Sequence, residues 1–485
     1  MQLFYLYFNL KKINLLLLLS TLLVIFSCVK DDHPEEIQKN KKVNEWIQAN
    51  MDVLYLWNNR LPVKKDQTLF PAKYFESLLY KEEDRFSFIA EDYVQLSEQL
   101  SGVQMEAGYD FTLFRKDMLS LDVIGVIDYI KPHSPATLTD LIRGDVFYTI
   151  NGKQLTISNY QKLQGEMSSP HTLGVYRNSR LQSISLKVDK YEENPVLLDS
   201  IYEIGGKKIA YLIYNFFAVD KGDNSYTYLK ELNEIFRKFK QASVNELVLD
   251  LRYDTGGQAV VTPALAGMIS GRSSSDLFCI DQYNSIVDEE LKKSQGDDYN
   301  KTFFDDYLII RDENGKIIDQ SIPVNKLSGL KRLYVLTSHK TASASELIIN
   351  GLKPYMDVIL IGDKTYGKNV GMWFIYENDP QKQKDNRWGM LPIVFKIYNS
   401  ENKSDYSNGF KADIEIDEYA MVPLLPLGNT RESLLEAALA HMNVQTASMM
   451  RSAEKRFDSR PLMSSVDRTP VRKNMIMSQK QLSGF

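Results

Sequence analysis

The spacing of apolar residues predicts helices in the first quarter of the chain. Between residues 41 and 98 apolar residues recur at every third or fourth position, as in VNEWIQANMDVLYLW at 43–57, a spacing typical of amphipathic helices. A second stretch of this kind, AKYFESLLY at 72–80, follows Pro71, and proline suits the first turn of a helix. We therefore expect a small helical domain here.

Residues 99–190 have a different pattern. Short runs rich in β-branched and aromatic residues, such as DVIGVIDYI at 122–130 and LGVYRN at 173–178, alternate with turn signals. Two of these signals are the Arg-Gly-Asp tripeptide at 143–145 and an Asn-Gly pair at 151–152. This section is expected to be a β-rich domain.

The section from 191 to 445 alternates between strand and helix patterns. Continuous apolar runs at 207–217 and 245–252 predict buried strands, and the amphipathic stretch TYLKELNEIFRKFK at 227–240 predicts a helix between them. Further strands are expected at 333–337 and 357–362. A β-α-β order of this kind favours an α/β core.

Charge is distributed unevenly along the 485 residues. The whole chain has a formal net charge of −5, but residues 446–485 carry eight Lys/Arg against three Asp/Glu. The body is therefore acidic, which argues against nucleic acid as the main partner. The basic tail, which contains prolines and scattered methionines, is predicted to be a disordered extension.

The N-terminus has the features of an export signal. Lys11 and Lys12 precede an uncharged run of fourteen residues at 13–26, which is short for a membrane span and typical of a signal peptide. The run ends in Ile-Phe-Ser-Cys, which resembles a bacterial lipobox and would make Cys28 the lipidated first residue of the mature protein. The alternative is a plain signal peptide with an incidental cysteine. The following VKDD at 29–32 resembles the export signal of Bacteroidetes surface lipoproteins, so we expect an outer-membrane lipoprotein, periplasmic or surface-exposed.

Cysteine and histidine usage limits the other chemistry. Without Cys28 only Cys279 remains, so no intramolecular disulfide is possible, and its apolar neighbours predict a buried thiol. The five histidines are scattered singly, which excludes the usual zinc spacings. We expect no cofactor and no metal.

The decapeptide GDKTYGKNVG at 362–371 resembles a phosphate-binding P-loop. In a P-loop, however, a Ser or Thr follows the lysine and the loop opens a helix. Here Asn369 follows Lys368, and the next residues favour a strand. Nucleotide binding is therefore disfavoured.

Lys368 suits a different role together with Ser343. A serine hydroxyl becomes a nucleophile when a neighbouring base removes its proton, and lysine can be that base only when burial keeps it neutral. Ser343 lies at the expected start of a helix, where N–H groups can also stabilise an oxyanion. The alternative for Ser343 is a capping box with Glu346.

The segment TASASELIINGLKPYMDVILIGDKTYGKNVG at 341–371 resembles the signature of carboxyl-terminal processing (tail-specific) peptidases. The resemblance implies that Ser343 is the nucleophile and Lys368 the general base, and that the core has a crotonase/ClpP-like α/β fold. Some members of this family have a glutamine four residues after the lysine, where this chain has Met372. Methionine is a weak hydrogen-bond acceptor, so the resemblance assigns no third catalytic residue here.

The segment LDLRYDTGG at 249–257 resembles a second motif of that family. It implies an oxyanion hole formed by the backbone N–H of Ala344 and of Gly256 or Gly257. The section 99–190 resembles a PDZ domain, and AGYDFTLF at 107–114 lies where such domains bind a peptide carboxylate. The resemblance thus assigns peptide binding to Gly108, Tyr109, Asp110 and Phe111.

Together these features predict five parts and one function. The expected function is a serine endopeptidase that cleaves unfolded or C-terminally presented polypeptides. The alternative is a membrane-anchored peptide-binding lipoprotein with an inactive protease core. The predicted parts are a signal peptide (1–28), a linker and helical domain (29–98), a PDZ-like domain (99–190), a Ser/Lys peptidase core (191–445) and the basic tail (446–485). The sequence does not indicate an oligomeric state.

Overall fold

The computed structural model describes residues 34–63, 65–177, 180–312, 316–444, 460–468 and 476–478. The chain divides into two compact units. The smaller unit takes the chain up to Asn50 together with Leu61–Leu79, and the larger takes Met51–Arg60 and Tyr80–Phe485. Cys28 and the predicted signal peptide lie outside the described residues.

The smaller unit is helical. It contains α3 (Pro71–Leu78) and most of α2 (Pro34–Leu54). Pro71 is the first residue of α3, as its position in the sequence predicted. Tyr74, Phe75 and Leu78 of α3 are buried, so this short helix is held by one apolar face. The Asn44 amide also donates to the backbone carbonyls of Gln67 and Leu69, at 2.8 and 2.7 Å.

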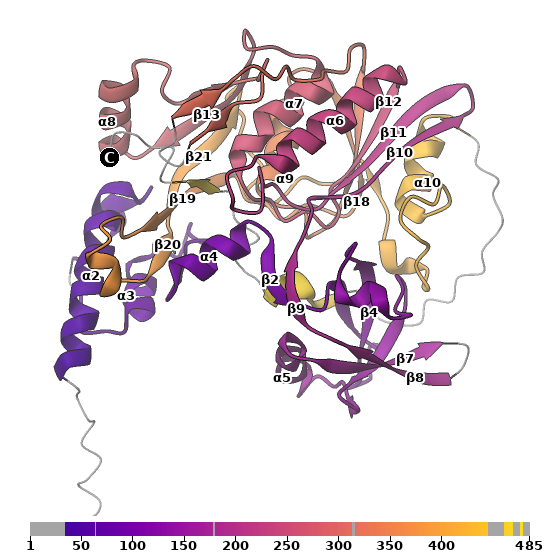
Figure 1. The fold of residues 1–485 in the computed structure, drawn as a ribbon, viewed down its shortest axis with the longest axis horizontal. Coiled ribbons are helices and arrows are strands. Elements are labelled where there is room, and N and C mark those ends of the chain that lie inside the picture. Colours follow the sequence, from indigo (N-terminus) through magenta and orange to yellow (C-terminus); the bar gives the residue numbers. More distant parts are fainter. Residues whose placement is uncertain are drawn as a thin grey trace, which may run out of the picture. The chain divides into compact units, whose positions relative to one another are not determined.

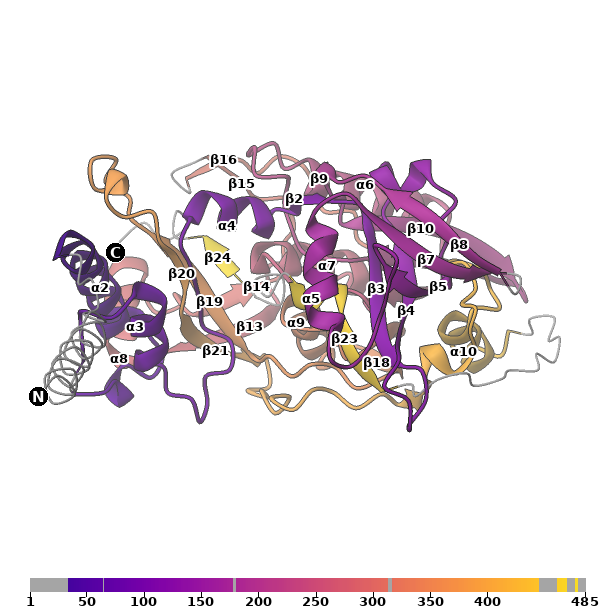
Figure 2. The ribbon, with the colours of Figure 1, turned by 90° about the horizontal axis from the view of Figure 1, so that it is seen from below.

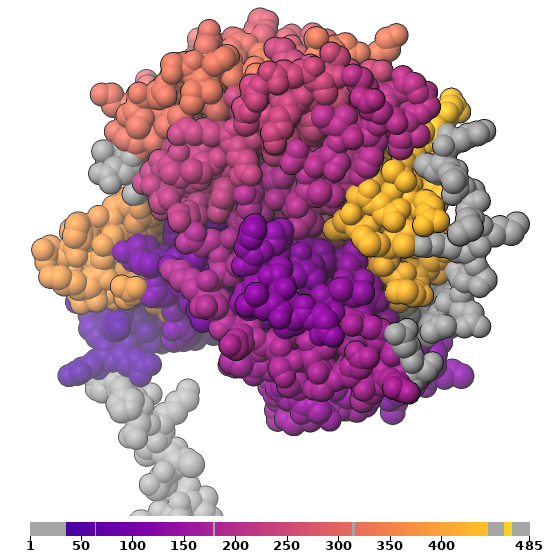
Figure 3. All heavy atoms as spheres, turned by 45° about the vertical axis from the view of Figure 1, so that its right-hand side comes forward, coloured from indigo at the N-terminus to yellow at the C-terminus, as the bar shows by residue number. Residues whose placement is uncertain are grey.

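The core of the larger unit is a six-stranded sheet in the order β10-β11-β12-β17-β18-β22. All neighbours pair in parallel except β10 and β11. The helix α10 packs on one face of this sheet, and α6, α7 and α9 lie on the other side (Figure 1). Figure 3 shows α10 in yellow at the molecular surface. The strands are β10 (Val196–Ile204), β11 (Lys207–Tyr214), β12 (Glu246–Asp250), β17 (Arg332–Thr337), β18 (Asp357–Gly362) and β22 (Ile414–Glu415), and the helices are α6 (Thr227–Gln241), α7 (Thr262–Ser270), α9 (Ala344–Leu352) and α10 (Ser433–His441).

A second, mainly antiparallel sheet continues from the first. Its order is β1-β20-β19-β21-β13-β14, and β19 follows β18 directly in the chain. The predicted helical section up to residue 98 is thus interrupted by a strand, β1, which pairs with β20. The strands are β1 (Phe88–Ala90), β13 (Leu277–Tyr283), β14 (Lys301–Phe303), β19 (Val370–Tyr376), β20 (Gly389–Leu391) and β21 (Ile393–Asn399), with helices α4 (Tyr93–Leu100) and α8 (Ser285–Gln295) and a small hairpin of β15 (Ile310–Arg311) and β16 (Ile317–Asp319).

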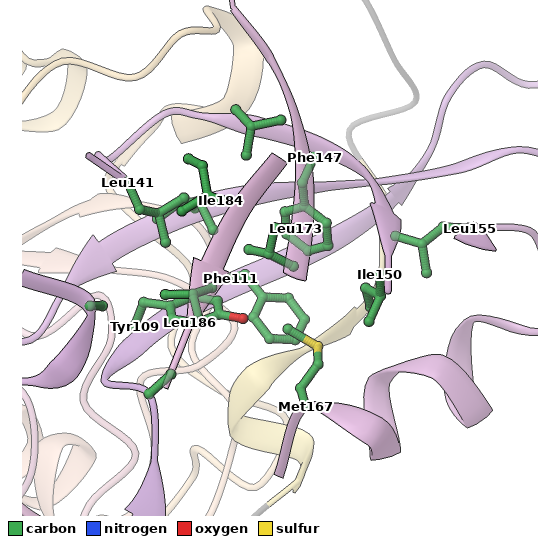
Figure 4. Packing of buried hydrophobic residues seen from close by; sticks show 14 of the residues in the cluster. Tyr109, Phe111, Leu141, Phe147, Ile150, Leu155, Met167, Leu173, Ile184 and Leu186 are labelled. Atoms are coloured by element: carbon green, nitrogen blue, oxygen red, sulfur yellow. The ribbon is translucent and has the colours of Figure 1, made fainter. Parts of the chain in front are cut away.

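Residues 103–192 form a β-rich domain within the larger unit. Its main sheet has the order β23-β3-β4-β5-β7-β8, with β6 on β5. Phe111, Phe147 and Leu173 from three of these strands pack at the centre of its apolar core (Figure 4). The elements are β2 (Val103–Glu106), β3 (Tyr109–Arg115), β4 (Val123–Ile130), β5 (Val146–Ile150), β6 (Lys153–Gln154), α5 (Tyr160–Gly165), β7 (His171–Arg177), β8 (Arg180–Leu186) and β9 (Asp189–Glu192).

Short 3-10 helices connect several of these elements. They are η1 (Asn58–Arg60), η2 (Pro135–Leu138), η3 (Glu166–Ser168), η4 (Ala259–Val261), η5 (Lys382–Lys384), η6 (Glu418–Ala420) and η7 (Ser465–Arg468). Among the described residues no helix is long and apolar enough to cross a membrane.

Parts of the basic tail are ordered, although its composition predicted disorder. The strand β23 (Pro461–Ser464) pairs with β3, and β24 (Ile476–Ser478) pairs with β19 (Figure 2). Both strands complete sheets built by other parts of the chain. Their order therefore comes from tertiary pairing, which the composition of the tail does not record.

Candidate active site

The ends of three neighbouring parallel strands position the candidate catalytic residues. β12 leads to Gly256 and Gly257, β17 leads to Ser343, and β18 leads to Lys368. Because β12, β17 and β18 are adjacent and parallel, their carboxyl ends lie at one edge of the sheet. Open α/β sheets commonly bind their ligands at this edge.

Ser343 has a strained backbone at the start of α9. Its φ is 63° and its ψ is −113°, a region that residues with a side chain rarely adopt. The side chain is buried, and its Oγ has no hydrogen-bond partner among the described residues. Backbone strain and an unpaired buried hydroxyl at one residue are typical of a functional position.

The Glu346 carboxyl group connects the Ser343 turn to the Lys368 loop. Its Oε2 accepts hydrogen bonds from the N–H of Ser343 at 3.0 Å and of Lys368 at 2.8 Å. Its Oε1 accepts from the N–H of Gly367 at 2.7 Å and from the hydroxyl of Thr365 at 2.6 Å. The capping interaction predicted for Glu346 is therefore present, and the same side chain also fixes the lysine loop against the serine.

Lys368 is fully buried in mostly apolar surroundings. Its Nζ lies 3.5 Å from the Met372 sulfur and 5.1 Å from the centre of the Phe86 ring. Burial lowers the pKa of Lys368 well below its ordinary value, although the carboxyl groups of Asp84 and Glu346 oppose this shift. The neutral form of Lys368, which a general base requires, is therefore populated at a lower pH than for an exposed lysine.

The same geometry speaks against the P-loop alternative. The residues after Lys368 form the strand β19, where a P-loop would open a helix. Gly367 instead makes a close backbone approach, since a Cβ added there would lie 2.5 Å from the Ser407 carbonyl oxygen. Arg85 reinforces this contact by donating to the carbonyls of Gly367 and Ser407, at 3.1 and 2.8 Å.

The predicted oxyanion residues lie next to Ser343. A Cβ added to Gly256 would lie 2.7 Å from the Ser343 Cβ, so only glycine permits this approach. The Gly256 N–H already donates to the Asp254 carboxyl group at 2.7 Å. Of the two glycines, Gly257 is therefore the better candidate donor, together with Ala344 at the first position of α9.

A cavity of about 280 Å³ is lined by residues that follow these groups in the chain, but not by Ser343, Gly257 or Lys368 themselves. Ala259 and Val260, just after Gly257, line one side of it, and Leu347, one helical turn after Ser343, lines another. Phe395 and Ile397 of β21 add further apolar surface. Asp281, Asp305 and Arg311 also line the cavity, so its wall is partly polar.

The four residues predicted to bind a peptide carboxylate lie at the start of β3 in the β-rich domain. Gly108 has a φ of 84° and packs against Ser134, while Tyr109 and Phe111 contribute their side chains to the domain core. Asp110 and the Phe111 N–H both bind the side chain of Ser465 from the tail, at 2.5 and 3.1 Å. These four residues thus belong to the β-rich domain and are distant from Ser343 in the sequence. Two of them already contact the tail segment around Ser465.

Two residues that the sequence did not single out form the lysine pocket. Asp84 and Phe86 precede β1, and Asp84 accepts hydrogen bonds from the Tyr55 hydroxyl at 2.8 Å and the Phe86 N–H at 2.9 Å. Neither residue shares a motif or a spacing with Lys368. Among the described residues, no group of three or more His, Cys, Asp or Glu side chains could hold a metal ion.

Comparison with known families agrees with this geometry. The model of peptidase family S41 matches residues 208–416, and the model of the peptidase S41 N-terminal domain matches residues 42–88. The chain belongs to peptidase family S41. This membership places it among the serine peptidases, and the motif around Ser343 and Lys368 lies inside the matched region.

Individual S41 relatives are similar over much of the chain. A CtpA-like serine protease named in Staphylococcus aureus strain N315 is 25% identical over 405 residues, which cover 81% of this chain and 70% of the relative. A CtpA-like serine protease named in Staphylococcus saprophyticus is 25% identical over 241 residues, or 49% of this chain and 40% of the relative. The crystal structure of a candidate S41 protease from Bacteroides fragilis NCTC 9343 has a TM-score of 0.65 at 28% identity and covers 82% of this chain and 97% of its own.

Replacing Met372 by glutamine should improve the orientation of Lys368. The thioether is a weak acceptor at 3.5 Å, whereas a glutamine carbonyl at this position would accept a full hydrogen bond from Nζ. We therefore expect kcat/KM for peptide cleavage to rise several-fold. The melting temperature should fall, because the amide N–H₂ group would be buried without a hydrogen-bond acceptor. Met372→Leu, which keeps the volume and removes the acceptor, is the matched control and should not raise kcat/KM.

Proposed function

We propose that this S41 protein is an endopeptidase that uses Ser343 as nucleophile and Lys368 as general base. The observation that carries the proposal is that one carboxyl group, Glu346, holds the turn of a strained, buried serine and the loop of a lysine whose pKa burial has lowered well below its ordinary value. Glu346 accepts a hydrogen bond from the backbone N–H of each residue, which supports their acting as a unit.

The mechanism follows from the chemistry of these groups. Neutral Lys368 takes the proton of the Ser343 hydroxyl as Oγ attacks the carbonyl carbon of the scissile peptide bond. The N–H groups of Gly257 and Ala344 stabilise the negative oxygen of the tetrahedral intermediate. Lys368, now an ammonium, gives its proton to the leaving amine as the C–N bond breaks. Water then attacks the acyl-enzyme while Lys368 takes its proton, and Lys368 returns that proton to Ser343 Oγ as the ester bond breaks and the carboxylate product leaves.

Unfolded or C-terminally presented polypeptides are the proposed substrates. The cavity that Val260 and Leu347 help to line follows the Gly257 turn and the Ser343 turn in the chain, and we propose that it receives a side chain of the substrate. The β-rich domain, which we propose to be PDZ-like, would hold a second part of the substrate by pairing with its edge strand. We further propose that a lipid on Cys28 anchors the protein to the outer membrane.

Labelling with a fluorophosphonate probe, which phosphonylates activated serines, tests the assignment. The mature chain should be labelled in a single covalent step, and Ser343→Ala should abolish labelling while its circular dichroism spectrum stays unchanged. Ser345→Ala is the matched control, because Ser345 lies two residues away on α9 and should leave labelling of Ser343 intact. A chain that binds peptides but is not labelled would instead favour an inactive, peptide-binding lipoprotein.

A further inference from the structure

The tail of this chain already occupies an edge of the β-rich domain. β23 pairs antiparallel with β3 (Figure 2). Met463 lies opposite Leu113 and Ser464 opposite Thr112. In the sheet order β23-β3-β4, the strand β3 would be an edge without the tail. Pairing an extended segment with such an edge is a common way of binding polypeptides.

Side chains add to this backbone pairing. The Ser465 hydroxyl donates to Asp110 at 2.5 Å and accepts from the Phe111 N–H at 3.1 Å. Leu462 and Met463 pack against the apolar core of the β-rich domain, and Ser465 is buried. The segment 460–468 is therefore held by main-chain, polar and apolar contacts at once.

The occupant of this edge is an internal segment of a chain. The backbone continues past Ser465 into η7 (Ser465–Arg468), so a hydroxyl lies where a terminal carboxylate had been expected. The surrounding side chains fit a hydroxyl better, because the Asp110 carboxyl group faces it. The Lys131 Nζ lies 3.8 Å from a carboxylate oxygen of Asp110. It also contacts carboxylate oxygens of Glu106 and Glu193, at 3.0 and 2.7 Å. Three acidic groups around one ammonium disfavour a further negative charge.

A second part of the tail lies in the peptidase core. β24 pairs in parallel with β19, with Ile476 opposite Met372 and Ser478 opposite Phe374. β19 begins two residues after Lys368, so the tail runs beside the strand that follows the candidate base. The tail thus pairs with one strand of the β-rich domain and with one strand of the peptidase core.

We propose that residues 460–468, together with 476–478, are an internal ligand of this enzyme, and that an external polypeptide must displace 460–468 before it can bind the β3 edge. The edge selects extended internal segments in preference to free C-termini, with two adjacent apolar residues, then one further residue, then a serine at the loop. This inference rests on the proposed function only for the statement that the external ligand is a substrate.

Peptide binding tests the inference independently of catalysis. The probe is a fluorescent peptide of residues 460–468, RPLMSSVDR, with blocked ends, and anisotropy measures its binding to the full mature chain carrying Ser343→Ala. Ser465→Ala removes both hydrogen bonds between the tail side chain and the loop, so we expect the apparent Kd of the peptide to fall about tenfold. Ser464→Ala is the matched control and should change the Kd less than about twofold, because the Ser464 hydroxyl binds only Asp467 of the tail among the described residues.

Equal peptide affinity in the two variants, or no binding to either, would overturn the proposal. A peptide that ends at Ser465 with a free carboxylate should bind more weakly than RPLMSSVDR, and tighter binding would overturn the preference for internal segments. With Ser343 restored, Ser465→Ala should lower KM for unfolded protein and leave kcat unchanged. If neither chain cleaves anything while the binding difference persists, the proposed function fails and the internal ligand stands.

Discussion

Replacing Lys368 by arginine should abolish peptide cleavage although the positive charge is retained. An arginine guanidinium stays protonated at every pH at which the protein is folded, so it cannot accept the Ser343 proton. We expect kcat/KM to fall on the order of 10³-fold or more, the size of a lost general base. Lys364→Arg, on an exposed residue of the same loop, is the matched control and should keep full activity.

Lys368→Met separates lost chemistry from lost folding. Methionine is neutral and similar in length, so the variant should keep or raise the melting temperature, whereas the buried guanidinium of Lys368→Arg should lower it. Both variants should be inactive. A Lys368→Met protein that keeps more than about a tenth of wild-type kcat/KM would contradict the role of Lys368 as base.

The pH profile of the wild-type enzyme provides a second measurement. Only neutral lysine can take the proton, and the neutral fraction rises as pH rises through the pKa of Lys368. Because burial lowers this pKa well below 10.5, kcat/KM should rise with pH and reach its plateau well below pH 10.5. A rise centred near 10.5 would mean that Lys368 is hydrated in the active enzyme.

The elements that position the site could be predicted where their pattern is local. The apolar runs and the amphipathic stretch in 207–252 predicted a strand, a helix and a second strand. The helix was predicted at 227–240, and α6 spans Thr227–Gln241, so this prediction is confirmed. Parallel strands buried on both faces give continuous apolar runs, so β12 and β18 were also predictable. The strand after Lys368 was expected from its branched and aromatic residues, and this prediction is confirmed by β19.

The contacts around the site depend on distant parts of the chain. Asp84 and Phe86 approach Lys368 because β1 joins the sheet of β19 and β20, and no sequence spacing records this pairing. Glu346 was predicted as a helix cap because its partner Ser343 is three residues away. Its bonds to the Lys368 loop cross a helix and a strand, so local reasoning could not find them. The order of β23 was missed for the same reason.

Replacing Glu346 by glutamine should both destabilise the protein and inactivate it. Both carboxyl oxygens accept hydrogen bonds, from three backbone N–H groups and one hydroxyl. Glutamine keeps one acceptor and brings an N–H₂ group against N–H donors. If the amide nitrogen takes the Oε1 position, the Thr365 hydroxyl can rotate and accept from it, but the Gly367 N–H loses its acceptor. If the nitrogen takes the Oε2 position, the N–H groups of Ser343 and Lys368 lose theirs. Either loss occurs in a buried site.

An unsatisfied buried donor costs about 1–3 kcal/mol, so unfolding in urea should show a loss of roughly 2–5 kcal/mol for Glu346→Gln. Catalysis should fall further than stability alone requires, because the Ser343 turn and the Lys368 loop lose their shared acceptor. Glu290→Gln, on an exposed position of α8, is the matched control and should change neither quantity. If Glu346→Gln, assayed at a temperature where it is fully folded, retained wild-type kcat/KM, then Glu346 would contribute to stability alone, and the alignment of Ser343 with Lys368 would have to come from the strands β17 and β18 themselves.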